Sequence, residues 1–372
     1  MRSVFFRWGR AGAALGLALS AHAFSVLNWN VNGNGAPDWS TNAAQVRAIG
    51  RIVRHLDADL ITLQEIPQDQ SAQVVEFVRA FLPGYHWATN SGTDGHIRSV
   101  ILSRYPIRRS QSWLDGAPLA PFGYDGAFTR DLFEAEIEVP GFRAPVHVFT
   151  THLKNGSDLR SATRRGAEAG AISNFFVHLF LPAHPDALYL LTGDLNEDVA
   201  RPGQNSHDAI PRLANNATGL RLTRPVNPLT GSERTWSSRM DFLVVRYDYI
   251  LPSTTLYARL ARSEVFQSSR LDPPPPPLRP GDDALASDHL PVLMVFRGAD
   301  PGPFALAWQP GDAGRWRLVW PGWPGYTYQV LRGDDLVHWR IAATLAPNGG
   351  HALSWPVPAD KPARFFRVRR IP

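Results

Sequence analysis

Short apolar runs that each adjoin a polar cluster constrain this chain more than any other feature of its sequence. The clusters contain acidic, amide or histidine side chains and lie at residues 28–30, 64–65, 151–152, 194–196 and 287–289. Apolar runs of this length, bounded by Gly, Pro, Asn or Asp, predict buried strands. Because the ends of neighbouring strands meet at one edge of a sheet, we expect the clusters to converge there. Glu, Asp, Asn and His together suit a hard divalent cation and proton transfer.

Apolar residues at helical spacing predict three helices, and the polar segment from Ser40 to Asn42 offers a cap for the first. The expected helices span about 41–55, 72–81 and 161–181. The expected strands span 98–103, 132–139, 145–151, 188–193 and 243–251. Strands mixed with helices, with hairpin-like neighbours among them, predict a mixed α/β sandwich.

Six short motifs follow one another between about residues 24 and 297. They are N-W-N-V-N-G (28–33), L-Q-E (63–65), T-H-L (151–153), G-D-L-N (193–196), Y-D-Y-I-L (247–251) and S-D-H-L-P-V (287–292). In this order and spacing they resemble the endonuclease/exonuclease/phosphatase superfamily, the metal-dependent phosphoesterases that include deoxyribonucleases, AP endonucleases and neutral sphingomyelinases. The resemblance implies an α/β (α+β) fold, a four-layer α-β-β-α sandwich with two sheets packed face to face and flanked by helices.

The first 23 residues have the pattern of a secretory signal peptide. Arg2, Arg7 and Arg10 form a basic region, the apolar stretch 11–20 is too short to span a bilayer, and an A-x-A cleavage site ends at Ala23. We therefore expect a secreted or periplasmic protein, cleaved near Ala23, with no transmembrane segment in the mature chain. An uncleaved membrane anchor is the alternative.

The composition changes after Gly298. We interpret residues 24–298 as a catalytic domain, 299–303 as a linker and 304–372 as a small all-β domain. The last segment holds six of the 12 tryptophans, which we expect mainly in a core rather than on a sugar-stacking platform. The five consecutive prolines at 273–277 predict an exposed loop that arches toward the site just before Asp288.

The composition indicates a globular protein and limits its partners. Hydrophobic residues make up 44% of the chain and charged residues 19%, which excludes a disordered protein. The full chain has 38 basic and 33 acidic residues, and three of the basic ones lie in the predicted signal peptide. The remaining excess of two positive charges gives no general reason to expect nucleic-acid affinity. The absence of Cys excludes disulfides and thiolate metal sites.

The polar clusters suit the hydrolysis of a phosphate ester by direct attack of water. Glu65, at the end of an expected strand, is the best candidate metal ligand, because Mg²⁺ favours one or two carboxylates together with water and substrate phosphate. The resemblance adds Asn30 and Asp288 to the metal site. Mn²⁺ and Ca²⁺ are the alternative cations.

Asp194 and Asn196 are expected to face one cavity, because positions i and i+2 of a strand or tight turn point the same way. Asp194 can accept a proton from water, and Asn196 can orient that water or hold phosphate. The resemblance implies the same roles for both residues. An Asx-turn is the purely structural alternative.

Two histidines, His152 and His289, are each able to donate a hydrogen bond to a phosphoryl oxygen. The resemblance implies that Asp248 orients His289 and favours its imidazolium form, and Asp241 remains a rival because its local pattern is similar. It also implies that Arg130 contacts the substrate phosphate.

These observations predict an exported Mg²⁺-dependent phosphodiesterase, a monomer without an obligate protein partner, acting foremost as a non-specific endonuclease on DNA. Asn32 stands where AP endonucleases have an acidic residue, which disfavours the abasic-site branch. The near-balanced charge leaves a second substrate class open, a lipid head group or other small phosphoester, as in sphingomyelinases or phosphoinositide phosphatases. A non-catalytic surface-binding protein is the remaining alternative.

Overall fold

The structure is a computed structural model of the chain. It describes residues 24–142, 144–200, 208–237, 242–298, 304–311, 315–322, 327–346, 352–357 and 365–371. The predicted signal peptide (1–23), the predicted linker (299–303) and Asp241 lie outside the described residues. Within the part of the chain that the structure describes, no helix is both long and apolar enough to cross a membrane.

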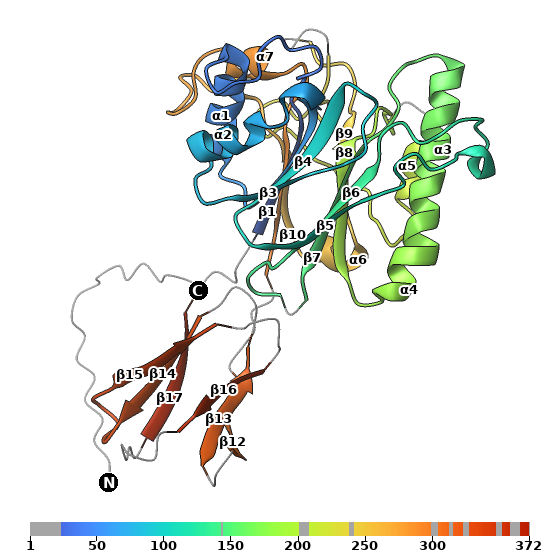
Figure 1. Cartoon of the computed structure of the whole chain (residues 1–372). Coiled ribbons are helices and arrows are strands. Elements are labelled where there is room, and N and C mark those ends of the chain that lie inside the picture. The colour runs from blue at the N-terminus through green and yellow to red at the C-terminus, as the bar shows by residue number, and fades with distance from the viewer. Residues whose placement is uncertain are drawn as a thin grey trace, which may run out of the picture.

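Two mixed β-sheets, packed face to face, form the centre of the fold (Figure 1). The first sheet has the order β10-β11-β1-β2-β4-β3, with β1 Phe24–Asn30, β2 Leu60–Pro67, β3 His86–Thr89, β4 Ile97–Ser103, β10 Leu260–Val265 and β11 Val292–Phe296. The second has the order β5-β6-β7-β8-β9, with β5 Ile107–Trp113, β6 Leu132–Ile137, β7 Val146–His152, β8 Leu188–Asp194 and β9 Asp248–Pro252. The predicted fold class is confirmed.

Helices cover the outer faces of the two sheets, α1 and α2 on the first and α3 on the second (Figure 1). The helices are α1 Ala44–Leu56, α2 Gln73–Phe81, α3 Leu159–Phe175, α4 Leu181–Ala183, α5 Ala209–Leu213, α6 Thr254–Tyr257 and α7 Asp282–Ala286. A π-helical turn, Phe176–Phe180, joins α3 to α4, and short 3₁₀ turns occur at Gln68–Gln70, Ala120–Phe122 and Ser268–Arg270. The three predicted helices are therefore present.

The predicted cap of the first helix is wrong. The helix begins at Ala44, and its N-cap residue, Ala43, makes no side-chain capping bond. Helix α1 is instead held by packing, since its apolar stripe, including Ile49 and Ile52, is fully buried under the first sheet. Helix α3 does have a side-chain cap, because Asp158 accepts a hydrogen bond from the backbone N–H of Ser161 at 3.0 Å.

Each sheet contains one parallel pair of strands, and these two pairs position the predicted clusters. Strand β1 is parallel to β2, and β7 is parallel to β8, whereas every other neighbouring pair is antiparallel. Parallel neighbours require a long crossover, which α1 and α3 supply. The carboxyl ends of both strands of a pair therefore lie at one edge of their sheet.

The layer between the sheets changes from apolar to polar along the strands. On β1, Phe24 and Val26 belong to the inter-sheet core, whereas Asn28 and Asn30 make hydrogen bonds to the second sheet. The intervening Leu27 and Trp29 face α1 instead. This period of two is the alternation expected of a strand that is covered on both faces. The sandwich is thus apolar in its depth and polar at one rim.

Two sequence expectations in the last third of the catalytic part need correction. The run 243–251 is a strand only from Asp248, because Val245 is taken up by an isolated bridge to Trp236. The proline-rich segment is an exposed loop as predicted, but its buried residue, Leu278, packs into the core beside α1 rather than toward the site.

The C-terminal β-sheets (β12–β17) are two small antiparallel sheets of three strands each. They comprise β12 Ala307–Pro310, β13 Trp316–Pro321 and β16 Ala352–Pro356 in one sheet, and β15 Arg340–Leu345, β14 Thr327–Gly333 and β17 Phe365–Ile371 in the other. Their core includes Leu318, Trp320, Tyr328 and Val330. Part of the tryptophan content is therefore structural, as expected. The exact domain boundaries stay a prediction.

Gly193 offers a test of how tightly β7 and β8 are packed. Its φ is +153°, and a Cβ there would lie 2.0 Å from the backbone oxygen of Thr151, a contact that only a backbone shift relieves. We expect Gly193→Ala to lower the free energy of unfolding by about 2 kcal/mol or more in urea denaturation. The control is Gly84→Ala, where φ is +90° but nothing lies within 4 Å, and we expect a loss of only about 1 kcal/mol. Equal losses would contradict the steric account.

Candidate active site

Strand register alone brings three of the predicted residues together, and a fourth joins them from the other sheet. In the second sheet, His152 of β7 is paired with Asp194 of β8, and Asp194 is paired with Asp248 of β9. Asn30, at the end of β1, reaches across from the first sheet, and its Nδ2 donates to Asp194 Oδ2 at 3.0 Å. The two sheets therefore meet at the Asp194 carboxylate.

Glu65 enters this group through a β-bulge. The register between β2 and β4 shifts between Leu63 and Ile66, and Glu65 has φ +61°, a left-handed conformation. Its carbonyl accepts a hydrogen bond from the N–H of Gly33 at 3.0 Å, which holds the bulge. The Asn30 amide that binds Asp194 also donates to Glu65 Oε1 at 3.0 Å. One amide thus holds two carboxylates side by side.

Glu65, His152 and Asp194 form a group that is able to bind a metal ion. One ligand atom of each lies within 4.8 Å of the others, and two of the three are carboxylate oxygens, which suit Mg²⁺ or Mn²⁺. Asn30 lies next to this group, as predicted. Asp288 does not belong to it: its Oδ1 is 4.0 Å from His289 Nε2, and its Oδ2 accepts from Trp236.

The Asp194 carboxyl group is almost completely buried, and its ionisation reflects this. Burial raises the pKa of Asp194 to about 7. The positive charge of His289 lowers this pKa and the negative charge of Asp248 raises it. Its Oδ2 lies 3.4 Å from His152 Nε2 and 3.7 Å from His289 Nε2. Asp194 can therefore exchange a proton near neutral pH.

His289 is paired with Asp248, the residue preferred from the sequence. Its Nδ1 lies 2.8 Å from Asp248 Oδ2, and both side chains are buried. Burial alone would lower the pKa of His289, but the negative charges of Asp248 and Asp194 outweigh it and raise that pKa to about 10. His289 is therefore an imidazolium at neutral pH, with Nδ1–H donating to Asp248.

His152 has the opposite ionisation. Burial lowers its pKa well below the usual value, and the positive charges of Arg130 and His289 lower it further. Its Nδ1 is buried and has no hydrogen-bond partner among the described residues. His152 is thus a neutral imidazole with one ring nitrogen left for a ligand.

Asn196 and Arg130 both brace the end of β7. The N–H of Asn196 donates to Asp194 Oδ1 at 3.0 Å, the Asx-turn considered from the sequence, while its Nδ2 donates to the Leu153 carbonyl at 3.2 Å. Arg130 Nη1 donates to the carbonyls of His152 and Leu153, at 2.9 and 3.3 Å. A phosphate contact by either residue stays a prediction.

Several residues that support the site were missed in the sequence. Trp236 Nε1 donates to Asp288 Oδ2 at 2.9 Å, and Ser287 Oγ donates to the Asn30 carbonyl at 2.7 Å. Asp94 pairs with Arg130 Nη2 at 2.9 Å from a loop 36 residues earlier in the chain. Only Ser287, within the S-D-H motif, had a local signal that would have identified it.

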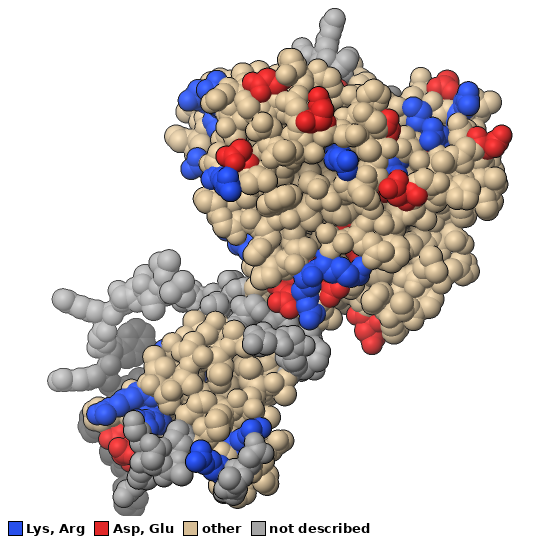
Figure 2. All heavy atoms as spheres, in the orientation of Figure 1, with Lys and Arg blue, Asp and Glu red and all other residues tan. Residues whose placement is uncertain are grey.

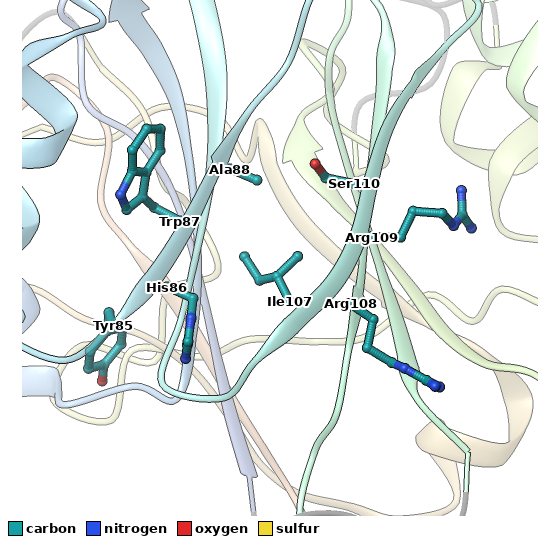
Figure 3. A pocket seen from close by; sticks show the side chains of 8 residues that line it. All are labelled: Tyr85, His86, Trp87, Ala88, Ile107, Arg108, Arg109 and Ser110. Carbon is teal, nitrogen blue, oxygen red and sulfur yellow. The ribbon is translucent and has the colours of Figure 1, made fainter. Parts of the chain in front are cut away.

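A separate hollow of about 440 Å³ lies between the edge strands β3 and β5, away from these residues. Figure 3 shows Ala88, Ile107 and Ser110 between the two strands, with the guanidinium groups of Arg108 and Arg109 directed away from β3. Both arginines are ion-paired with glutamates of β6 and its end, Glu134, Glu136 and Glu138. The hollow contains none of the predicted site residues.

A model of the Endonuclease/Exonuclease/phosphatase family matches residues 27–289, a stretch that includes every predicted site residue. Comparison with curated protein sequences gives no match.

Solved structures of the same fold include enzymes from bacteria and animals. A crystal structure of an endonuclease/exonuclease/phosphatase from Beutenbergia cavernae has a TM-score of 0.53 and 19% identity, covering 94% of this chain and 100% of that one. Truncated Caenorhabditis elegans TDP2 has a TM-score of 0.52 and 19% identity, covering 75% and 99%. D. rerio TDP2 complexed with single strand DNA product has a TM-score of 0.50 and 16% identity, covering 74% and 98%. At these identities the similarity concerns the fold.

The two histidines provide a test of the site's electrostatics in the metal-free protein. In an NMR titration with ring-labelled histidine and EDTA, we expect His289 to stay doubly protonated through pH 8 and to lose its proton near pH 10. His152 should become protonated only well below the ordinary pH range of a histidine. Asp248→Asn should lower the pKa of His289, because it removes the largest stabilising charge. Asp288→Asn, the matched control, should lower it less. A His289 that titrates near its ordinary value of about 6.5 would contradict the assignment.

Proposed function

Because this chain belongs to the endonuclease/exonuclease/phosphatase family, we propose that the phosphoester it hydrolyses is the phosphodiester backbone of DNA, with Mg²⁺ as the cation. The family assignment makes it a metal-dependent phosphoester hydrolase. The observation that carries the proposal is the Asn30 amide, which holds the Glu65 and Asp194 carboxylates beside two histidines of opposite ionisation. The single strand DNA product held by D. rerio TDP2, which shares the fold, supports DNA as the first substrate to test.

Glu65 is the proposed main ligand of the cation, with Asn30 beside it. A divalent cation bound there would neutralise phosphate oxygens and the leaving oxygen. Asp288 is a weaker candidate in this structure, because Trp236 holds its Oδ2. Its exposed fraction of 33% still leaves it accessible to a ligand at the rim.

Asp194 is the proposed general base. The attacking water gives its proton to the Asp194 carboxylate, whose pKa burial raises to about 7 in the metal-free protein. Hydrogen bonds from Asn30 to Oδ2 and from the Asn196 N–H to Oδ1 fix the carboxylate. Proton transfer therefore needs little reorganisation of the side chain.

The histidines and Asn196 are proposed to act on the phosphoryl group. His289, an imidazolium oriented by Asp248, donates from Nε2 to a phosphoryl oxygen and stabilises the negative charge that develops there. The neutral His152 can donate one hydrogen bond without adding charge. The amide of Asn196 is proposed to donate to the phosphoryl group as well as to the Leu153 carbonyl. Arg130 fixes the backbone that carries His152.

A lipid head group or other small phosphoester is the second candidate substrate. It is favoured by the charge of residues 24–298, which include 26 basic and 28 acidic residues and so lack the basic excess typical of nuclease surfaces. Turnover of sphingomyelin or a phosphoinositide, without cleavage of plasmid under any divalent cation, would replace the DNA proposal by this one.

Plasmid nicking by the mature protein tests the proposal. We expect cleavage with Mg²⁺ or Mn²⁺ and none in EDTA. Asp194→Asn should lower turnover by about 10²–10⁴, because it removes the base. Glu65→Gln should raise the Mg²⁺ concentration needed for half-maximal activity. The control Glu76→Gln, on the exposed face of α2, should change neither turnover nor that Mg²⁺ concentration. Near-normal turnover by Asp194→Asn would overturn the assignment of the base.

We also propose that the enzyme is exported, on the basis of the signal-peptide pattern of residues 1–23. The protein recovered from the periplasm or culture medium should have the intact mass of a chain that begins at Phe24. A mass that includes residues 1–23 in the membrane fraction would contradict cleavage and favour an anchor.

A further inference from the structure

The part of the molecule that contains the two large sheets shows no broad basic area on the face seen in Figure 2. Lys and Arg lie there in small groups with Asp and Glu among them, and wide uncharged areas separate these groups. Residues 24–298 also have a slight acidic excess. Affinity for a chain of phosphates depends on contacts with cationic side chains. A preference for such a chain therefore requires single basic groups placed close to the site.

Lys154 is a basic group in such a position. It is one of only two lysines in the chain, and it follows His152 by two positions. Because two residues of chain span at most about 7 Å, the backbone of Lys154 lies beside that of His152 at the rim. Burial lowers the pKa of His152, and Lys154 is among the positive charges that lower it further. The ammonium group is thus close enough to act on the His152 ring.

Two buried charges of α3 fix the peptide groups of Lys154 from both sides. Its N–H donates to Glu168 Oε2 at 2.7 Å, and its carbonyl accepts from Arg165 Nη1 at 3.0 Å. The same guanidinium nitrogen donates to the Gly156 carbonyl at 3.0 Å, while Glu168 Oε1 accepts from the N–H of Thr129 at 2.9 Å. Glu168 and Arg165 are 0% and 3% exposed, and a buried charge is costly unless such bonds compensate for it. Both charges therefore serve to hold the rim.

The residue before Lys154 is fixed as firmly. The N–H of Leu153 donates to the Asp194 carbonyl at 3.1 Å, and its own carbonyl accepts from Asn196 Nδ2 at 3.2 Å and from Arg130 Nη1 at 3.3 Å. Surface loops are usually the more mobile parts of a fold. The segment 152–156 is instead tied to the end of β8 and to α3. Such preorganisation is typical of segments that position side chains for a ligand.

The side chains that this fixed segment presents to solvent are those of Lys154, which is half-buried, and Asn155, which is exposed. Lys154 Nζ donates to Asn155 Oδ1 at 3.1 Å, a neutral acceptor that does not compensate the positive charge. An ammonium group has three donors, so two remain for a ligand. Arg130 differs, because Asp94 and two backbone carbonyls already hold its guanidinium group. Lys154 is therefore the better placed of the two to bind an additional anion.

We propose that Lys154 is a specificity-determining residue that binds a second phosphate of the substrate, next to the phosphate that is hydrolysed. An ammonium group suits this role, because it contacts phosphate as a point charge and needs no bidentate geometry. A nucleic-acid strand supplies such a phosphate at each nucleotide, and a phosphoinositide supplies one on its ring, whereas sphingomyelin has a single phosphate. The inference rests on the proposed function, because in DNA the second phosphate is the next link of the same strand.

Steady-state kinetics of the full mature chain with Mg²⁺ test this role. We expect Lys154→Gln to lower kcat/KM for a short DNA duplex by about tenfold, mainly through a higher KM, because it removes a hydrogen bond between charged groups. Turnover of bis(4-nitrophenyl) phosphate, which has a single phosphate, should change far less. Lys154→Arg keeps the charge and should keep most of the preference for DNA. The control Arg79→Gln, an equal loss of charge on the exposed face of α2, should affect neither substrate.

The salt dependence gives a readout that a purely structural role of Lys154 would not change. Loss of one phosphate contact should reduce the slope of log kcat/KM against log salt concentration by about 0.9 on duplex DNA. DNA cleavage with the same KM and salt slope in Lys154→Gln as in the wild-type chain would overturn the inference and leave the proposed function standing. An equal loss of activity on DNA and on bis(4-nitrophenyl) phosphate would overturn it as well.

Failure of the DNA proposal gives a different result. If the wild-type chain does not cleave DNA, the same variants are compared on vesicles that contain a phosphoinositide with ring phosphates and on vesicles that contain sphingomyelin. A loss in Lys154→Gln that is confined to the phosphoinositide would support the second-phosphate contact and replace DNA as its source. Turnover of sphingomyelin alone, or equal effects on both lipids, would overturn the inference together with the DNA proposal.

Discussion

The hydrogen-bonded amide layer between the two sheets is the constraint on which the site depends. Asn28 is fully buried, and its three bonds, from Nδ2 to the Gly193 carbonyl and to Oδ1 from Thr62 and Gln64, all lie within 2.9–3.2 Å. A buried amide without partners is costly, so these bonds fix the register of one sheet against the other. A slip by one residue would turn Asn28 into the apolar core beneath α1. Asn30 and Asp194, two residues farther along their strands than Asn28 and Thr192, take their positions from this layer.

Burial, which makes an unpaired polar group in this layer costly, also gives the ionisable groups at its rim different pKa values. The pKa of Asp194 is raised by burial, and the pKa of His289 is raised by two neighbouring carboxylates. The pKa of His152 is lowered. Groups only a few ångströms apart therefore hold different charges at one pH, which is the condition for dividing acid, base and electrostatic roles among them. No side chain in the group is special by type; its neighbours decide its role.

Sequence reasoning predicted those parts of the fold that have a local pattern and failed for those that depend on distant contacts. Strand ends and the two crossover helices follow from runs that are contiguous in the chain. The pairing of Asp248 with His289, 41 residues apart, was expected only from the family resemblance. The bond from Trp236 to Asp288 joins residues 52 positions apart, and nothing near Trp236 signals it. The start of β9 was predicted too early for the same reason, because Val245 forms an isolated bridge with the distant Trp236 and is not part of the strand. The net charge of the whole chain was also a poor guide to its charge distribution, because it averages a basic C-terminal segment with a slightly acidic catalytic one.

That unequal distribution of charge has a physical rationale at the site itself. Arginines placed next to Asp194 would add to the positive charges of His289 and the cation, lower the pKa of Asp194 further and weaken it as a base. The same charge would lower the pKa of His289 and make its imidazolium form less stable. Arg130, a buried arginine beside His152, is already held by Asp94 and two backbone carbonyls. The ionisation on which hydrolysis depends is therefore set by burial and by neighbouring carboxylates rather than by arginines.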